Sequence, residues 1–278
     1  MNKYGWTNYR GKVKALILDW SGTAADAYVL APAVVFVEVF KKHRVEISMQ
    51  EARGPMGLRK DLHIKALTEV DTIKERWKSV YGKYPDQKDV DNMFKDFVPM
   101  QLDCLRQYTG LLPGIAEVTQ RLQSQGIKLG STTGFIRPMV DILEEEAEKQ
   151  GYKLDASVAG DEVKNGARPG PHMVYKNLDL LGIEPIQSVV KVDDTVSGVG
   201  EAVNAGCWGV GVSLYSNYMD IDSIEHGKSL SPEEIDERNQ KTKKMLEEAG
   251  AHYVIDSLAD IEPVIEEINQ RLAKGEKP

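Results

Sequence analysis

The fold of this chain is decided by residues 13–19, with the sequence VKALILD, and by residues 20–23, WSGT, which follow at once. The first segment is a short apolar run of the kind that forms a strand buried on both faces. The second is polar and contains a glycine, which is typical of a turn. Asp19 therefore stands where a buried strand ends, and in open α/β sheets that end of the strands faces the ligand.

Four more short apolar runs follow late in the chain, and segments with a helical pattern separate them. The runs are Ile127–Ser131, Val189–Val192, Trp208–Val212 and Tyr253–Ile255. The helical patterns cover residues 115–125, 137–150, 171–182, 196–205 and 258–273, and a charge-rich helix is expected over 231–250. Strands that alternate with helices predict an α/β fold, with a Rossmann-like parallel sheet covered on both faces.

Residues 27–107 interrupt this alternation. Their apolar residues recur at helical spacing, as in Trp77 and Tyr81, and no segment has a convincing strand pattern. A helical block inserted after the first strand is most simply a separate small domain. We therefore expect a catalytic core formed by residues 1–26 and 108–278, with residues 27–107 inserted as a helical cap domain.

The composition is that of an ordinary globular protein. The 278 residues are 41% hydrophobic and 28% charged, and the net charge is −8. This charge opposes binding to nucleic acids or anionic membranes, and the longest apolar run, residues 27–37, is too short to span a bilayer. Cys104 and Cys207 form neither a disulfide framework nor a zinc spacing, and the first residues have no apolar signal core. We therefore expect a cytoplasmic protein with no nucleic-acid or membrane partner.

Polar residues follow three of the expected strands, at the end where ligands bind. They are Asp19, the pair Thr133-Gly134 and the pair Asp193-Asp194. Acidic residues, a hydroxyl and free backbone N–H groups can together hold Mg²⁺ and a phosphoryl group. Each group alone is more often a turn, a cap or a solvated loop, and only their occurrence at successive strand ends favours a site.

Four segments of this chain resemble, in order and spacing, the four motifs of the haloacid dehalogenase superfamily. They are residues 19–23, 131–134, 165–169 and 192–195. The resemblance implies that Asp19 attacks phosphorus, and that Thr133 and the Gly134 amide hold phosphate oxygens. Arg168 takes the place of the cationic third motif, and Asp194 is the implied metal ligand of the fourth. The implied cofactor is Mg²⁺, with the ligands Asp19, Ser21 and Asp194.

The residue two positions after the expected nucleophile is Ser21. Phosphatases of this superfamily generally carry a second aspartate there, which protonates the leaving alkoxide and later activates water. A serine hydroxyl cannot act as a general acid near pH 7, although the backbone carbonyl of Ser21 can still bind Mg²⁺. Either the protein is a weak phosphatase, or its leaving group is handled in another way.

Residues 51–63 of the expected cap resemble the cap of the phosphonoacetaldehyde hydrolases (phosphonatases), one branch of this superfamily, and the resemblance runs nearly end to end. In that branch a cap lysine, which corresponds to Lys60, forms a Schiff base with a phosphonate aldehyde. The resemblance implies that His63, on the same helix face, assists proton transfer and that Met56 contacts the substrate. Packing roles for both residues stay open. A homodimer is also implied, because relatives pair through the cap.

The chemistry of this substrate explains why the chain has a lysine in the cap and no acid at position 21. Cleaving the C–P bond of phosphonoacetaldehyde directly would expel a carbanion, whereas a protonated imine on the adjacent carbon accepts the electron pair and yields an enamine. No alkoxide leaves, so an acid at position 21 is not needed. Lys60 must be partly neutral to attack the carbonyl, and burial or nearby cations can lower its pKa from about 10.4. Arg53 and Arg59 are the candidate cations nearby in the sequence.

Several positions depart from the family pattern. Ser21 stands where the family usually has alanine, Phe135 where some relatives have tyrosine, and Val29 where some have cysteine. Gly198 replaces an acidic residue of the fourth motif, for which Asp193 can compensate as an outer carboxylate. These substitutions bear on metal affinity and on contacts with the substrate more than on the reaction class.

Three other functions stay open. A phosphomonoesterase or phosphomutase of the same superfamily would need an acid at position 21. A non-catalytic phosphoacceptor module, similar in topology to a response-regulator receiver, would have no use for the cap or for Lys60. A haloacid dehalogenase needs no metal ligand at Asp194. We therefore predict Mg²⁺-dependent hydrolysis of phosphonoacetaldehyde to acetaldehyde and phosphate, with Asp19 and Lys60 as the reacting side chains.

Overall fold

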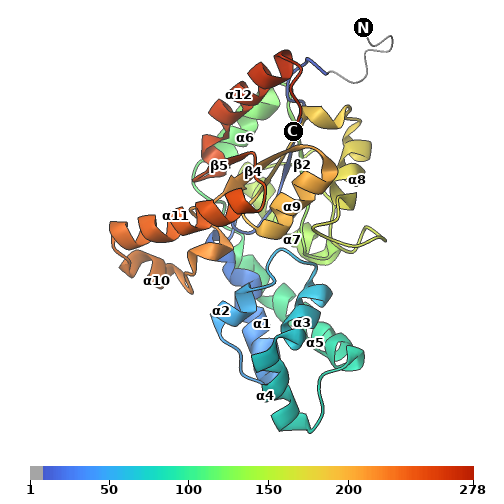
Figure 1. The fold of residues 1–278 in the computed structure, drawn as a ribbon, viewed down its shortest axis with the longest axis vertical. Coiled ribbons are helices and arrows are strands. Elements are labelled where there is room, and N and C mark those ends of the chain that lie inside the picture. The colour runs from blue at the N-terminus through green and yellow to red at the C-terminus, as the bar shows by residue number, and fades with distance from the viewer. Residues whose placement is uncertain (1–8) are drawn as a thin grey trace.

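The computed structural model describes residues 9–278, and its centre is a five-stranded sheet in the order β2-β1-β3-β4-β5. All neighbouring strands in this sheet are parallel. The strands are β1 (Ala15–Leu18), β2 (Lys128–Ser131), β3 (Val189–Asp193), β4 (Trp208–Val212) and β5 (Tyr253–Ile255). This confirms the expected α/β fold with a Rossmann-like parallel sheet (Figure 1).

Helices cover both faces of the sheet. They are α6 (Ile115–Ser124), α7 (Arg137–Lys149), α8 (His172–Leu181), α9 (Val196–Ala205), α11 (Pro232–Glu248) and α12 (Ile261–Ala273). A short helix, α10 (Ile224–Ser229), lies away from the sheet at the left of Figure 1. Ile17 of β1, an inner strand of the sheet, belongs to a buried cluster with Val174 of α8 and Ala202 of α9. Leu16 and Leu18 belong to a second cluster, which includes residues of α6 and α12. Because both faces are covered, the strand is apolar throughout.

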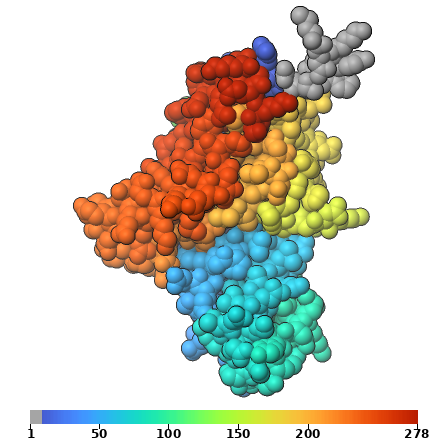
Figure 2. Space-filling view, in the orientation of Figure 1, coloured from blue at the N-terminus to red at the C-terminus, as the bar shows by residue number. Residues whose placement is uncertain are grey.

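The helices of residues 27–107 lie together beyond the carboxyl ends of the strands, at the lower end of the molecule in Figures 1 and 2. They are α1 (Leu30–Lys42), α2 (Met49–Arg53), α3 (Lys60–Glu69), α4 (Asp71–Tyr81) and α5 (Gln87–Leu105). Helix α1 packs against α5, and α3 packs against both α4 and α5. We call this group the helical layer. Its division from residues 1–26 and 108–278 as a separate domain stays a prediction, and residues 1–8 lie outside the described part of the chain.

Short 3₁₀ turns connect several of these elements, at Ala27–Val29, Arg106–Tyr108, Ile186–Ser188, Asn217–Met219 and Leu258–Asp260. Within residues 27–107 the structure contains no strand, as the sequence pattern predicts. No helix found in residues 9–278 combines the length and the apolar character that crossing a bilayer requires.

The chain enters α1 through a strained turn. Asp26, Tyr28 and Val29 have φ angles of 53°, 67° and 55°. This left-handed region costs a non-glycine residue about 1–2 kcal/mol. The Asp26 carboxylate offsets part of this cost, because it accepts hydrogen bonds from the N–H groups of Leu30 and Ala31 at 3.1–3.3 Å. The turn therefore sets the direction in which α1 leaves the sheet.

One buried arginine anchors the helical layer to the core. The guanidinium of Arg53, at the end of α2, donates hydrogen bonds to the backbone carbonyls of Tyr28, Asn217 and Ile221 at 2.6, 3.2 and 2.5 Å. Several carbonyls can satisfy a guanidinium because it carries five N–H donors in a fixed plane. The side chain therefore ties α2 to the segment that follows β4.

Packing of α1 on α5 provides a test of what stabilises the helical layer. Phe97 of α5 is fully buried and stacks on Phe36 of α1, with ring centroids 4.6 Å apart. We expect Phe97→Ala to lower the free energy of unfolding by about 3–5 kcal/mol, because removal of the ring leaves a cavity. Phe94→Ala, at a partly exposed position of the same helix, is the control and should cost much less. Urea unfolding measures both variants, and equal losses would contradict this account.

Candidate active site

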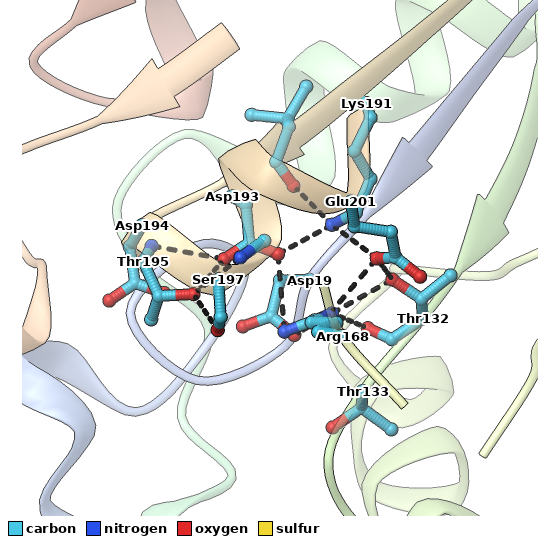
Figure 3. A network of polar contacts seen from close by, with 12 residues as sticks. Asp19, Thr132, Thr133, Arg168, Lys191, Asp193, Asp194, Thr195, Ser197 and Glu201 are labelled. Carbon is cyan, nitrogen blue, oxygen red and sulfur yellow. Dashed lines mark hydrogen bonds and ion pairs between the residues drawn. The ribbon is translucent and has the colours of Figure 1, made fainter. Parts of the chain in front are cut away.

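A buried arginine lies at the centre of the polar residues that follow β1, β2 and β3 (Figure 3). Arg168, in the segment before α8, is only 2% exposed. Its Nη2 donates to a carboxylate oxygen of Asp19 at 2.7 Å, and to the carbonyl and hydroxyl oxygens of Thr132 at 2.5 and 2.8 Å. One guanidinium therefore joins the ends of β1 and β2, beside the expected nucleophile.

Further charged residues complete this network, and the sequence analysis missed two of them. The Nε of Arg168 donates to Glu201 at 3.1 Å, and its Nη1 lies 3.2 Å from Asp193. The amine of Lys191 lies 2.5 Å from Asp193 and 3.8 Å from Glu201. Lys191 belongs to β3 and Glu201 to α9, so both lie in elements that the sequence pattern assigns to the hydrophobic core. The signal that could have found them is their charge at positions that the pattern buries.

Three buried carboxylates of this site could hold a metal ion. Asp19, Asp193 and Asp194 each offer an oxygen within 4.8 Å of the others. The Oδ2 of Asp194 accepts a hydrogen bond from the backbone N–H of Asn217 at 2.9 Å, whereas Oδ1 has no partner among the described residues. Burial, and then the charges of Asp193 and Asp19, raise the pKa of Asp194 well above its usual value. A buried carboxylate oxygen without a partner, beside like charges, suits a hard cation such as Mg²⁺.

One pocket brings together nearly all of the predicted site residues. The core contributes Asp19, Ser21, Thr133, Gly134, Arg168 and Asp194 to its lining, and the helical layer contributes Met56, Gly57 and Lys60. Val29 and Phe135, two positions that depart from the family pattern, also line it. His63 is the one predicted site residue that is absent from this lining.

The amine of Lys60 is buried against aromatic rings. Lys60 begins α3 and is 4% exposed, and its Nζ lies 4.5 Å from the ring centroid of Phe135 and 5.8 Å from that of Phe36. Burial lowers the pKa of Lys60 to about 8, the charge of Asp19 opposes this shift, and the charge of Arg168 adds to it. A substantial fraction of this amine is therefore neutral near pH 8.

Neither arginine that neighbours Lys60 in the sequence is the cation that acts on it. Arg59 donates to the carboxylate of Asp61 at 2.6 and 2.8 Å, and Arg53 donates to carbonyls of the core. The cation whose charge lowers the pKa of Lys60 is Arg168. The structure therefore replaces the two candidates nearby in the sequence with a residue that lies far from Lys60 along the chain.

His63 lies on α3, one turn after Lys60 and behind the pocket. Its ring is fully buried and stacks on Phe36 with centroids 3.8 Å apart, and its Nε2 lies 2.8 Å from the carbonyl oxygen of Ala52. Burial, and then the charge of Lys60, hold the pKa of His63 well below its usual value. Because the carbonyl can only accept, Nε2 carries a proton, and the lowered pKa keeps the ring neutral near pH 7.

The two layers approach so closely at Gly134 that no side chain fits there. A Cβ atom at this position would lie 2.4 Å from the carbonyl oxygen of Leu58, in the segment that leads to Lys60. Glycine is therefore required, and the turn after β2 is in direct contact with the helical layer. This contact closes the pocket on the side of the predicted phosphate-binding turn.

Comparisons with known proteins identify the family. The family model of haloacid dehalogenase-like hydrolases matches residues 17–212. A phosphonoacetaldehyde hydrolase from Nitratidesulfovibrio vulgaris is 41% identical over 270 residues, which cover 97% of this chain and 96% of that protein. Another from Paraburkholderia phytofirmans is 40% identical over 96% of this chain and 99% of that protein.

Solved structures agree with these relatives. A phosphonoacetaldehyde hydrolase-like protein from Oleispira antarctica superposes with a TM-score of 0.95 at 39% identity, over 100% of both chains. A β-phosphoglucomutase from Clostridium difficile has a TM-score of 0.65 at 18% identity, over 93% of this chain and 98% of its own, and this likeness shows the fold alone. With relatives of this identity along almost its whole length, the chain belongs to the phosphonoacetaldehyde hydrolase family, a branch of the haloacid dehalogenase-like hydrolases.

Proposed function

We propose that this protein hydrolyses the C–P bond of phosphonoacetaldehyde, through a Schiff base on Lys60 and an aspartyl phosphate on Asp19. Membership of the family makes it a hydrolase, and relatives at 41 and 40% identity carry this substrate in their names. One observation above all supports the mechanism. The Lys60 amine is buried in the same pocket as Asp19, in a protein that has Ser21 where a phosphatase needs an acid.

Lys60 acts first, on the aldehyde. Its neutral amine adds to the carbonyl carbon, and loss of water gives a protonated imine attached to α3. A pKa of about 8 supports this step, because it leaves part of the amine unprotonated near neutral pH. When the C–P bond breaks, the imine accepts the electron pair of that bond, and the species that leaves phosphorus is a neutral enamine.

Asp19 receives the phosphoryl group. Its carboxylate attacks phosphorus in line with the C–P bond and forms an acyl phosphate. Arg168, the Thr133 hydroxyl and the Gly134 N–H donate to the phosphoryl oxygens and so spread the developing charge. Protonation of the enamine carbon and hydrolysis of the resulting imine release acetaldehyde and restore Lys60. Water then cleaves the acyl phosphate to give orthophosphate.

Mg²⁺ is the cofactor that these residues fit. We assign its protein ligands to the carboxylates of Asp19 and Asp194 and the backbone carbonyl of Ser21. The unpartnered Oδ1 of Asp194 and the close carboxylates around it support this assignment. When bound, the ion neutralises negative charge on the phosphoryl group and on the carboxylates that surround it.

Further roles come from the family resemblance. Met56 contacts the bound phosphonate from the helical layer, and its place in the pocket lining supports this role. His63 assists proton transfer during imine formation, and its Nδ1, buried and without a partner among the described residues, is the atom left to take part. Residues 27–107 act as a cap that closes over the substrate and excludes water. We also infer a homodimer that forms through this cap.

Trapping with borohydride tests the Schiff base. Sodium borohydride should inactivate the protein irreversibly only when phosphonoacetaldehyde is present, and mass spectrometry should then find an ethyl group on Lys60. Lys60→Arg should lower kcat by about a thousandfold or more, because a guanidinium does not form the imine. Lys65→Arg changes an exposed lysine of the same helix, and this control should keep the activity.

Three results would contradict this mechanism. Full activity in Lys60→Arg would remove the lysine from the reaction. Sugar phosphates turned over faster than phosphonoacetaldehyde would instead indicate a phosphomonoesterase or phosphomutase, and no turnover of any substrate would favour a non-catalytic phosphoacceptor.

The pH dependence should follow the ionisation of Lys60. Only the unprotonated amine reacts, and its pKa of about 8 lies below the ordinary lysine value. We therefore expect kcat/KM to rise with pH through about 8 and then to level off, since this parameter reports ionisations of the free enzyme. Initial rates across a pH series measure the midpoint. A midpoint at the ordinary lysine value of about 10.4 would show that the free enzyme does not bury this amine.

Mg²⁺ should stabilise the folded protein through Asp194. A ligand that binds only the folded state adds about 2.7 kcal/mol at a hundred times its Kd, so Mg²⁺ should raise Tm and EDTA should reverse the effect. Asp194→Asn should lose this response. It should also raise the Tm of the metal-free protein, because it removes a carboxylate that its neighbours repel. Glu247→Gln, on the exposed face of α11, is the control, and a normal Mg²⁺ response in Asp194→Asn would contradict the ligand assignment.

A further inference from the structure

Two aromatic rings, one from each layer of the molecule, face the amine of Lys60. Phe135 follows β2 in the core, and its ring centroid lies 4.5 Å from Nζ. Phe36 belongs to α1 of the helical layer, and its ring centroid lies 5.8 Å from Nζ. The face of an aromatic ring carries partial negative charge, and it attracts a cation that lies within about 6 Å of the centroid. A protonated Lys60 is therefore in range of both rings, and Phe135 is the nearer of the two.

The core holds Phe135 in place. Its backbone N–H donates to the hydroxyl of Thr133 at 3.2 Å, and its carbonyl accepts from the N–H of Gly160 at 2.8 Å. The side chain is 1% exposed and lines the same pocket as Lys60. A contact between a cation and a ring is stronger when both are removed from water. Burial therefore strengthens the attraction between this ring and the lysine nitrogen.

The nitrogen that the ring faces carries positive charge at two stages of the proposed reaction. Before the substrate binds, it is the ammonium nitrogen of Lys60, and after addition to the aldehyde and loss of water it is the nitrogen of the protonated imine. The atom is the same in both, so one ring face can serve both cations. A neutral imine accepts the electron pair of the C–P bond far less readily, so a ring that keeps the imine protonated favours its reactive form.

Charged side chains also act on this nitrogen, and they do not replace the ring. The carboxylates that favour the cation and the guanidinium that opposes it act through their charge, and they are Asp19, Asp26, Asp194 and Arg168. His63, on the same helix as Lys60, has a pKa well below its usual value and stays neutral near pH 7. Two of the carboxylates, Asp19 and Asp194, are assigned to the metal ion, whose charge would offset theirs. The ring face keeps its effect whether or not the ion is bound.

We propose that Phe135 is a catalytic residue, whose ring face stabilises the positive charge on the Lys60 nitrogen, first in the ammonium and then in the protonated imine. Burial favours the neutral amine that attacks the aldehyde, and the ring favours the cation that must form afterwards. The role in the imine rests on the proposed function, whereas the contact with the ammonium does not.

Fluorination of the ring tests this proposal in the full-length protein, because fluorine withdraws negative charge from the ring face and changes the size of the ring little. Mono-, di- and trifluorophenylalanine at position 135 should lower the pH midpoint of kcat/KM stepwise, by about one pH unit in the trifluoro variant. At a pH of about 9, kcat should fall by about threefold or more, because less of the imine is then protonated. A midpoint that stays in place along the series would overturn the proposal.

Two further sets of variants separate the ring face from simple packing. Phe135→Leu keeps an apolar side chain without a ring face, and it should lower the midpoint about as far as the trifluoro variant does. The same fluorinated series at Phe36 is the matched control. That ring is farther from Nζ, so its series should shift the midpoint by less than about half as much. Equal shifts at the two positions, or a loss of Tm at position 135 without a shift, would overturn the role of Phe135.

Labelling of Lys60 separates this proposal from the proposed function. Acetic anhydride reacts only with a neutral amine, so the rate of Lys60 acetylation across a pH series gives its midpoint without any substrate, with mass spectrometry as the measurement. Lys65, an exposed lysine of the same helix, should keep its midpoint in every variant. If the wild-type protein does not hydrolyse phosphonoacetaldehyde, the proposed function fails. A labelling midpoint of Lys60 that falls with fluorination would still support the contact with the ammonium, and one that does not move would overturn it.

Discussion

The buried contact between Arg168 and Asp19 is the interaction on which the rest of the site depends. Removing a charged group from water costs several kcal/mol, which only close and well-oriented partners offset. Arg168 has such partners on three sides, in the carboxylates of Asp19, Asp193 and Glu201. These residues follow β1, end β3 and belong to α9, so the guanidinium holds separate elements in one arrangement. The carboxylate of Asp19, the nucleophile in the proposed mechanism, is thereby oriented before any substrate binds.

The same network holds more acidic than basic side chains, and burial together with this crowding raises the pKa of Asp194. The carboxylates of Asp19, Asp193, Asp194 and Glu201 face the cations Arg168 and Lys191, and all of these residues are buried. A phosphonate would be repelled from this edge of the sheet without a further cation, which is why a divalent ion belongs in the proposal. The charges of this network also act on the Lys60 amine. Burial lowers its pKa and Asp19 limits the fall, so the pKa stays near 8, where both protonation states are accessible.

Contact between the two layers of the molecule gives Lys60 these properties. The lysine is the first residue of α3, and it would be an ordinary solvated lysine if the helical layer stood apart from the core. Three features hold the layers together: the strained turn at Asp26, the Arg53 anchor, and the contact between Leu58 and Gly134. In the proposed mechanism, the contact that buries Lys60 against the core is also the contact that places its amine in the pocket with Asp19.

The fold class, the five strands and the location of Asp19 could be predicted from the amino-acid sequence, because the length and spacing of apolar residues decide which segments are buried together. Through the family resemblance it also predicted a site role for Lys60, which the structure places in the pocket and which stays a prediction. The sequence could not place Lys191 or Glu201 in the network around Arg168, because both lie inside a strand or helix whose apolar pattern predicts only a contribution to the hydrophobic core. The direction of Arg53, the pKa of Lys60 and the ring that faces its amine were decided only by the tertiary structure. Each depends on contacts between segments that are far apart in the chain, and local spacing carries no information about such contacts.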